Sequence, residues 1–371
     1  MAAPTDLRSA VSEPISRGAS PNLDLLRSFA VLMVLVNHLT RHYHYDHFDA
    51  VGLFGVLLFF VHTSLVLMYS MQRSHLTGFA LVKDFYIRRV FRIYPLVILA
   101  VLAALALHLH AESHGLEIGA YPGTREVLSN LFLVQNLTHA RSLIGPLWSL
   151  PFEVQMYLFL PFLFLWKKRS FWKLLAIWLV CGLFRQVPAA IPGLAWFTLW
   201  LYIPNFLPGV IAFARPERRI FPSWLWPVFL LLLTAVFARW HSSAMGAAAC
   251  MVLGIAIPRF KEITFSPVKF IASRIATYSY GIYLSHAFII WYALSLHDSW
   301  ILFWLMWLTI PVLLYHAFEH PSVLLGKRIA EMLSAPSRGS KTVEPSVVEP
   351  RPAEPVTVEP AAVGPQIETA A

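Results

Sequence analysis

The sequence predicts an all-α integral membrane protein that crosses the bilayer about ten times and keeps both termini in the cytoplasm. Hydrophobic residues make up 57% of the 371 residues and charged residues 13%, with a mean hydropathy of +0.61. Soluble domains carry about 25% charged residues. The apolar residues also gather in runs close to the ~20 residues that a membrane-spanning helix needs.

Several of the apolar runs contain proline, which membrane helices tolerate because their neighbours satisfy the freed carbonyl. The seventh and eighth runs are separated by a very short stretch and are expected to form a tight helical hairpin. The stretch Val127–Leu137 is too short to span and is expected to be re-entrant or interfacial. The ten candidate spans cover residues 22–41, 51–71, 88–109, 147–166, 171–187, 195–214, 223–240, 243–258, 276–296 and 299–320.

Lysine and arginine collect in alternate loops, which fixes the predicted orientation. Cytoplasmic loops are enriched in these residues, so an even number of spans and two cytoplasmic termini follow. The opposite loops hold few basic residues, namely Arg41, Arg125, Arg141 and Arg239. The net charge of +9 therefore indicates loops that face anionic lipid, and no nucleic-acid partner is expected. The basic loops hold Arg8, Arg17, Arg73, Lys83, Arg88, Lys167, Lys168, Arg169, Arg215, Arg218, Arg219, Arg259, Lys261, Lys269, Arg274, Lys327 and Arg328.

The two ends of the chain differ from the membrane domain, which is expected to cover residues 22–328. Residues 1–21 are polar and lack the apolar core of a cleavable signal peptide, so they are expected to form a cytoplasmic segment. Residues 335–371 are rich in Pro, Val, Glu and Ala, and VEP recurs among them. Such a composition cannot bury a core, which predicts a disordered cytoplasmic tail.

The first span contains two ionisable residues, Arg27 and His38, eleven positions apart. Eleven helical steps separate them by roughly 16 Å along the helix and by about three turns, so both lie on nearly the same face. Ionisable groups inside a membrane are costly and rarely face lipid. Two interpretations stay open: a polar pair satisfied inside the bundle, or a catalytic base, His38, set above a cationic docking site.

The third span opens with DFYIRRVFRIYPL, in which Arg89 and Arg92 are one helical turn apart and follow Arg88. Two arginines at this spacing present two forked donors on one face, which suits phosphate. Ordinary anchoring at the cytoplasmic surface is the alternative.

The fourth span contains PLWSLPFEVQMYLF, which places Glu153 about 10 Å below the outer surface at 1.5 Å per residue. A carboxylate at that depth needs a partner or a proton. By the predicted topology His38 also lies in the outer half of the membrane. Glu153 is therefore a candidate to orient the His38 imidazole as a general base.

Two further groups of polar residues have a structural alternative. The ninth span contains YSYGIYLSHAFII, and a tyrosine-rich face of this kind is also expected of a helix with a purely structural role. The loop RHYHYDHFD brings together His42, His44, His47 and Asp46. Exposed loop histidines without cysteine partners are more often solvated than metal-bound, so no metal is expected.

Taken together and in order, these motifs resemble the acyltransferase-3 family of multi-pass membrane O-acyltransferases. The similarity covers Leu23 to about Arg328. Two elements depart from the family pattern: GVLLFFVHTS keeps GVxLFFxxSG only in part, and Glu319-His320-Pro321 replaces Glu-Arg-Pro. The matching elements are Arg27-x10-His38, Arg89-x-x-Arg92, Trp148-Ser149-Leu150-x-x-Glu153-x-Gln155-x-Tyr157, and SYGIYL-x-H from Ser279 to His286.

The resemblance implies that an acyl-CoA donor, with acetyl-CoA favoured, binds from the cytosol. It implies that Arg27, Arg89 and Arg92 hold the nucleotide phosphates, with His38 as general base and Glu153 beside it or beside the acceptor. The acceptor is expected to be a hydroxyl of a sugar, a lipid-linked glycan or a small molecule at the bacterial inner membrane. Part of the family carries an esterase-like domain after the membrane domain; only the tail is expected here, so a relay through such a domain is expected to need another protein. The expected substrate contacts are Trp148, Ser149, Gln155, Tyr283 and His286.

A transporter or flippase is the main alternative, because intramembrane His, Glu and Arg also line transport pathways. Transporters of this size carry an internal repeat of hydropathy and motif. The polar elements here differ from span to span, which favours the enzyme. A purely structural membrane protein is disfavoured by the four separate polar groups inside the spans.

Overall fold

A computed structural model describes residues 20–334 apart from 113–114, 120, 167–169, 186, 188–190 and 192–197. The basic cluster at 167–169, almost all of the expected N-terminal segment, and the expected C-terminal tail lie outside the described residues. The following account concerns the described part of the chain alone.

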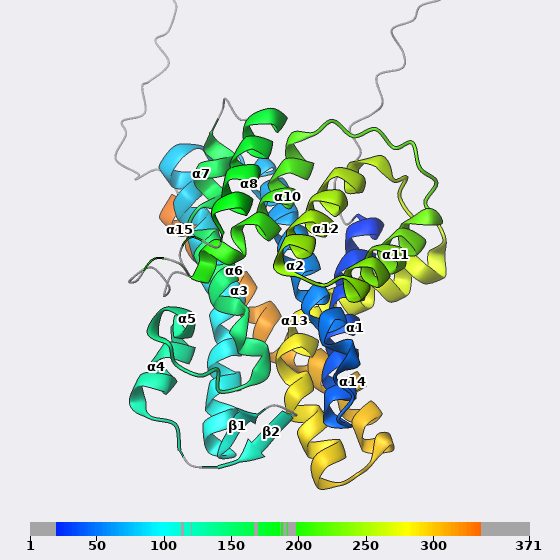
Figure 1. Ribbon diagram of the computed structural model, residues 1–371. Coiled ribbons are helices and arrows are strands. Elements are labelled where there is room, and N and C mark those ends of the chain that lie inside the picture. Colours follow the sequence, from blue (N-terminus) through cyan, green and yellow to red (C-terminus); the bar gives the residue numbers. More distant parts are fainter. Residues whose placement is uncertain are drawn as a thin grey trace, which may run out of the picture. The chain divides into compact units, whose positions relative to one another are not determined.

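The helices follow the predicted spans closely (Figure 1). Many end within a few residues of the predicted limits, because the apolar runs are bounded by charged or turn-forming residues. The helices of the predicted spans, apart from the fourth, are α1 (Pro21–His42), α2 (Asp49–Gln72), α3 (Gly78–Ala106), α8 (Phe171–Phe184), α10 (Ile203–Ala214), α11 (Leu225–Arg239), α12 (Ser243–Ala256), α13 (Ser266–Ile290) and α14 (Trp300–Leu314).

Five helical stretches are long and apolar enough to cross a bilayer: Pro21–His42, Asp46–Gln72, Gly78–Ala106, Gly145–Leu165 and Trp300–Leu333. Four shorter apolar helices accompany them, and α11 and α12 form the predicted hairpin around Trp240–Ser242. These lengths and compositions support a polytopic membrane protein. The number of ten spans and the cytoplasmic location of both termini stay predictions.

Two helices of the bundle continue through a π-helical turn. After α13 the turn covers Trp291–Leu296, and after α14 it covers Tyr315–Glu319 and leads into α15 (His320–Ser334). A π turn inserts one residue into the helical repeat and shifts the faces that follow it. The second of these turns carries Glu319, whose side chain is fully buried.

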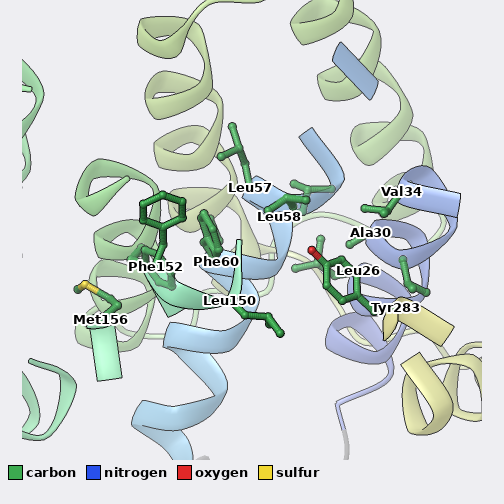
Figure 2. Close-up of a cluster of buried hydrophobic side chains, with 14 of the residues drawn as sticks. Leu26, Ala30, Val34, Leu57, Leu58, Phe60, Leu150, Phe152, Met156 and Tyr283 are labelled. Carbon is green, nitrogen blue, oxygen red and sulfur yellow. The ribbon is translucent and has the colours of Figure 1, made fainter. Parts of the chain in front are cut away.

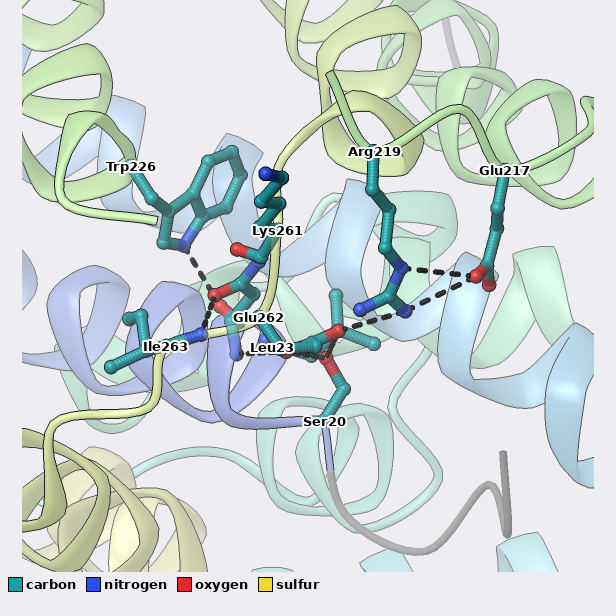
Figure 3. Close-up of polar contacts among 9 residues, drawn as sticks. Ser20, Leu23, Glu217, Arg219, Trp226, Lys261, Glu262 and Ile263 are labelled. Atoms are coloured by element: carbon teal, nitrogen blue, oxygen red, sulfur yellow. Dashed lines mark hydrogen bonds and ion pairs between the residues drawn. The ribbon is translucent and has the colours of Figure 1, made fainter. Parts of the chain in front are cut away.

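The N-terminus of α1 is held by a polar cluster that Figure 3 shows. Ser20 caps the helix by accepting from the Leu23 amide, and its hydroxyl donates to the Glu262 carboxylate (2.9 Å). The Trp226 indole N–H donates to the Asn22 carbonyl (3.0 Å). Arg219 in turn pairs with Glu262 at 3.3 Å. These contacts fix the position of α1, and therefore the position of every polar side chain that it carries.

The fourth predicted span is not one helix. A 3₁₀ turn at Gly145–Trp148 leads into α6 (Leu150–Tyr157) and then α7 (Leu160–Leu165). Each piece begins with a proline at its first or second position, where the missing N–H is tolerated. The Leu158 carbonyl at the second break accepts from the Tyr86 hydroxyl (2.9 Å), so a neighbouring helix satisfies it, as expected for proline in a membrane.

The long loop before α6 contains the one departure from an all-α fold among the described residues. Strand β1 (Leu109–Glu112) pairs antiparallel with β2 (Gly115–Ile118), Leu109 opposite Ile118. The predicted all-α fold is confirmed for the described residues, and this hairpin of two four-residue strands is a local addition in a loop. In Figure 1 the hairpin, α4 and α5 lie at one end of the helices and α7 and α8 at the other.

The predicted re-entrant or interfacial stretch forms two short helices, α4 (Thr124–Leu131) and α5 (Gln135–Thr138). Buried amide side chains tie them to the chain ahead of α6. Asn130 Oδ1 accepts from the Leu143 amide (3.0 Å), and Gln135 Nε2 donates to the Leu147 carbonyl (2.8 Å). The loop thereby holds the 3₁₀ turn that precedes α6.

The core joins α1, α2, α6 and α13, as Figure 2 shows. Leu26, Ala30 and Val34 project from one face of α1 at spacings of four and are buried. They belong to the same buried cluster as Leu57 and Leu58 of α2. Lipid tails are as apolar as these side chains, so within a membrane this face stabilises α1 through close van der Waals packing.

Helices α2 and α10 approach each other at Gly209. The Ser64 hydroxyl of α2 donates to the Phe206 carbonyl of α10 (2.7 Å). A Cβ at Gly209 would collide with that hydroxyl and with the backbone at Val61 and Leu65. Small residues allow such close approach of membrane helices.

Gly209→Ala is expected to lower the melting temperature of the detergent-solubilised protein, because overpacking costs about 1–3 kcal/mol. Gly182→Ala in α8 is the matched control: no atom outside its own helix lies within 4 Å of the added carbon. Alanine favours helices over glycine, so the control should melt at or above the wild-type temperature. Equal melting temperatures for Gly209→Ala and wild type would show that α2 and α10 can move apart at Gly209 without loss of stability.

Candidate active site

The predicted site residues, apart from Gln155 and His286, line two neighbouring cavities. The first, here called the His38 cavity, has a volume of about 360 Å³, and its walls include His38, Arg41, Asp49 and Trp148. The second, the arginine cavity, has a volume of about 90 Å³. Tyr283 lines both cavities. The two cavities are therefore neighbours with one shared wall.

The arginine cavity contains all three predicted phosphate-binding residues, Arg27, Arg89 and Arg92. Arg27 lies in the second turn of α1, whereas Arg89 and Arg92 lie near the middle of α3, because α3 begins at Gly78, ten residues before the predicted span. Neighbouring Arg88 is engaged elsewhere, because its guanidinium pairs with Asp84 at 2.8 Å. The predicted grouping of Arg27 with Arg89 and Arg92 is thus present in the structure.

Each of the three guanidinium groups has a different environment. Arg27 Nε donates to the Ser279 hydroxyl of α13 (2.5 Å). Arg92 forms an ion pair with the fully buried Glu319. Arg89 Nε is buried and has no hydrogen-bond partner among the described residues. A buried donor without an acceptor favours the entry of an anion or a polar ligand.

Glu153 lies in the arginine cavity, and its carboxylate accepts from the Tyr157 hydroxyl one turn later in α6. It does not line the His38 cavity, and no hydrogen bond joins it to His38 within the described residues. The expected contact between these two residues is therefore not found. The expectation rested on the depth of Glu153 below the outer surface, and depth alone does not identify neighbours: the structure places Glu153 in the cavity of the three arginines instead.

His38 lies near the end of α1, and its side chain is partly buried in the wall of its cavity. Gly145, the first residue of the 3₁₀ turn ahead of α6, lies close to His38: a Cβ added at Gly145 would be 3.4 Å from the His38 ring. On the other side the His38 ring packs against His286 of α13, with ring centroids 4.7 Å apart. The structure thus brings together two of the predicted site residues that are 248 positions apart in sequence.

Tyr283 separates the two cavities. Its hydroxyl is 2.6 Å from the Ser149 hydroxyl and donates to the Pro146 carbonyl (2.9 Å). Trp148 lines the His38 cavity and Ser149 the arginine cavity, so the start of α6 runs along the same partition. A chain-like ligand that reaches from one cavity to the other must pass Tyr283.

Gln155 lines neither cavity. Its amide group pairs with Asn136 of α5 in both directions, at 2.8 and 3.2 Å. Gln155, which was expected to contact the substrate, therefore holds α5 against α6 instead.

Sequence reasoning missed several polar groups of the His38 cavity. Asn37, Arg41 and Asp49 lie at the junction of α1 and α2. When the Asn37 side chain is oriented with its amide nitrogen toward the nearby acceptors, that nitrogen donates to the Asp49 carboxylate (2.9 Å). Asn37 and Arg41 lie next to His38 in α1, so their closeness in sequence could have identified them as candidate cavity residues. Glu112 reaches the cavity from the β-hairpin, and nothing in the sequence links it to His38.

No three histidine, cysteine or acidic side chains of the described residues are placed to hold a metal ion. Cys181 and Cys250 are buried thiols, as their apolar surroundings predict.

A family model described as an acyltransferase domain matches residues 20–315. The peptidoglycan O-acetyltransferase OatA of Listeria monocytogenes serovar 1/2a is 26% identical over 321 residues, which cover 73% of this chain and 49% of that protein. An inferred O-acetyltransferase of Staphylococcus aureus (strain COL) is 28% identical over 152 residues, 38% of this chain and 24% of that protein. The chain thus spans half or less of these relatives' length. No solved structure matches the chain.

Glu319→Ala is expected to destabilise the protein, because removing one partner of a buried ion pair leaves an uncompensated charge and costs about 3–5 kcal/mol. Thermal unfolding in detergent measures the effect. Glu331→Ala is the matched control, since that carboxylate is 57% exposed and only 3.9 Å from Lys327. A melting temperature lowered equally by both changes would contradict the special role of the Arg92–Glu319 pair.

Proposed function

Because the chain belongs to the acyltransferase-3 family, we propose that it transfers an acetyl or other short acyl group from acyl-CoA to a hydroxyl group. The acceptor is a sugar, a lipid-linked glycan or a similar molecule at the bacterial inner membrane. The position of the two cavities on either side of Tyr283 carries this proposal, since it sets a cationic compartment beside one that contains a histidine. The name of the Listeria relative supports a cell-wall glycan as acceptor.

The arginine cavity is the donor site in this proposal. Phosphate oxygens of the CoA moiety accept hydrogen bonds from Arg89 and Arg92, and the unpartnered Arg89 Nε gains an acceptor. Arg27 adds a third positive charge at the inner end of α1. Guanidinium groups suit this task because they remain charged when they are partly removed from water.

The pantetheine arm of the donor extends past Tyr283 into the His38 cavity. The distance it has to cover is comparable to the roughly 16 Å between Arg27 and His38 along α1. The hydrogen bond between Tyr283 and Ser149 closes this route in the structure, so the arm has to displace it. The thioester then lies beside His38.

Neutral His38 removes the proton from the acceptor hydroxyl as its oxygen attacks the thioester carbonyl. A C–O ester bond forms and the C–S bond breaks. The proton held by His38 passes to the departing thiolate, which leaves as CoA thiol, so the residue returns to its starting state. Polar groups around the His38 cavity, among them Asp49 and Glu112, are available to hold the hydroxyls of the acceptor.

The test uses membranes that contain the wild-type chain, with acetyl-CoA labelled in its acetyl group, and follows the label into lipid and glycan fractions. His38→Ala is expected to reduce transfer at least about 100-fold, because general-base catalysis contributes 10²–10⁴-fold. Arg89→Ala is expected to raise the KM for acetyl-CoA through loss of a charged phosphate contact.

His241→Ala and Arg274→Ala are the matched controls, since both side chains are exposed and lie outside the two cavities. They should transfer label at the wild-type rate. Undiminished transfer by His38→Ala at equal protein level would remove the proposed base. Movement of an unmodified glycan or lipid across the membrane, without label transfer by the wild type, would favour a transporter instead.

A further inference from the structure

His286 is a fully buried histidine that packs directly against the proposed base. It is 1% exposed and lies one residue before Ala287 and four before Ile290, two α13 residues that line the His38 cavity. His286 itself does not line that cavity. Because its ring centroid is 4.7 Å from that of His38, it stands behind the base as seen from the cavity.

The hydrogen bonding of His286 fixes its tautomer. Its Nδ1 is 3.2 Å from the Ile282 carbonyl, one turn earlier in α13. A carbonyl oxygen can only accept, so Nδ1 must carry the proton of the neutral ring. The other nitrogen, Nε2, is then an acceptor. It is buried and has no partner among the described residues.

The packing around His286 offers His38 as the donor for that nitrogen. The Tyr283 hydroxyl, on the previous turn, is committed to Ser149 and Pro146. Ser285 follows a different direction, because successive residues of a helix point about 100° apart. His38 carries an N–H in its neutral state, and its ring packs against that of His286 with the two ring planes tilted by 55°.

We propose that His286 is a positioning residue: its Nε2 accepts the N–H of His38 and so leaves the opposite His38 nitrogen unprotonated and facing the cavity. This inference rests on the proposed function of His38 as base. It assigns to a buried histidine the orienting role that the third member of a catalytic triad performs. The pairing also survives proton transfer, since protonated His38 is a donor at both nitrogens.

Two substitutions separate hydrogen bonding from packing. His286→Leu fills a similar space without an acceptor, and His286→Gln places an amide oxygen near the position of Nε2. Ser285→Ala is the matched control, because Ser285 is also a buried polar residue without a side-chain partner among the described residues, on the adjacent position of α13.

The first readout is acetyl transfer from labelled acetyl-CoA, measured as kcat and KM. His286→Leu should lower kcat about 100-fold, the lower end expected when a general base loses its correct tautomer. Its KM for acetyl-CoA should stay unchanged, because the arginine cavity is intact. His286→Gln should recover most of kcat, and Ser285→Ala should match wild type.

The second readout does not require catalysis. Diethylpyrocarbonate acylates unprotonated imidazole nitrogens, and mass spectrometry of the peptide that contains His38 gives its rate of modification. An acceptor behind the ring raises the basicity of the opposite nitrogen. The rate should therefore fall several-fold in His286→Leu and remain near the wild-type value in His286→Gln and Ser285→Ala.

Equal kcat and equal labelling of His38 in wild type and His286→Leu would overturn the inference. A folded His286→Gln variant as inactive as His286→Leu would overturn it too, since the acceptor would then be irrelevant. If the wild type transfers no acyl group, the proposed function fails while the labelling of His38 still decides whether His286 orients it.

Discussion

The placement of three partly buried guanidinium groups inside the helix bundle is the constraint on which the rest of the site depends. A charge removed from water is costly unless it is paired or bonded, and within a membrane the cost is higher. The chain meets this demand with Glu319 against Arg92 and with Ser279 against Arg27. Arg89 keeps a donor without an acceptor. The donor site is thus built with one unfilled hydrogen bond, in the position where an anionic ligand is proposed to bind.

Helix α1 sets the distance between the cationic site and the proposed base. It carries Arg27 in one cavity and His38 in the other, on nearly the same face. Its depth is fixed by the cluster of Ser20, Glu262 and Trp226 at its N-terminus. Because a helix is rigid over three turns, the separation between cationic site and base is set by the number of residues between them. The partition at Tyr283 comes from another helix, so opening the route need not move α1.

Regular helices made most of this arrangement predictable from the sequence. The Arg27–His38 pair and the Arg89–Arg92 pair each depend on one helix, whose periodicity is a local property. The positions of Glu153 and Gln155 were not predictable in the same way, because the chain ahead of them changes from a 3₁₀ turn to a helix. Contacts between distant segments, such as Glu112 from the hairpin and His286 beside His38, depend on tertiary packing that no periodicity contains.

The π-helical turns show why local patterns cannot give the complete site. Glu319 closes the turn Tyr315–Glu319, and its carboxylate meets Arg92 of α3. The helix that follows packs closely on α3, since a Cβ at Gly326 would collide with Phe91. Glu319 and Gly326 are seven residues apart, so a regular helix places them on nearly the same face. An uninterrupted α-helix from α14 into α15 would turn that face by about 100° relative to α14. The extra residue of the π turn thus sets the direction in which the helix after α14 presents both its ion pair and its close contact, and π turns are frequent at functional sites.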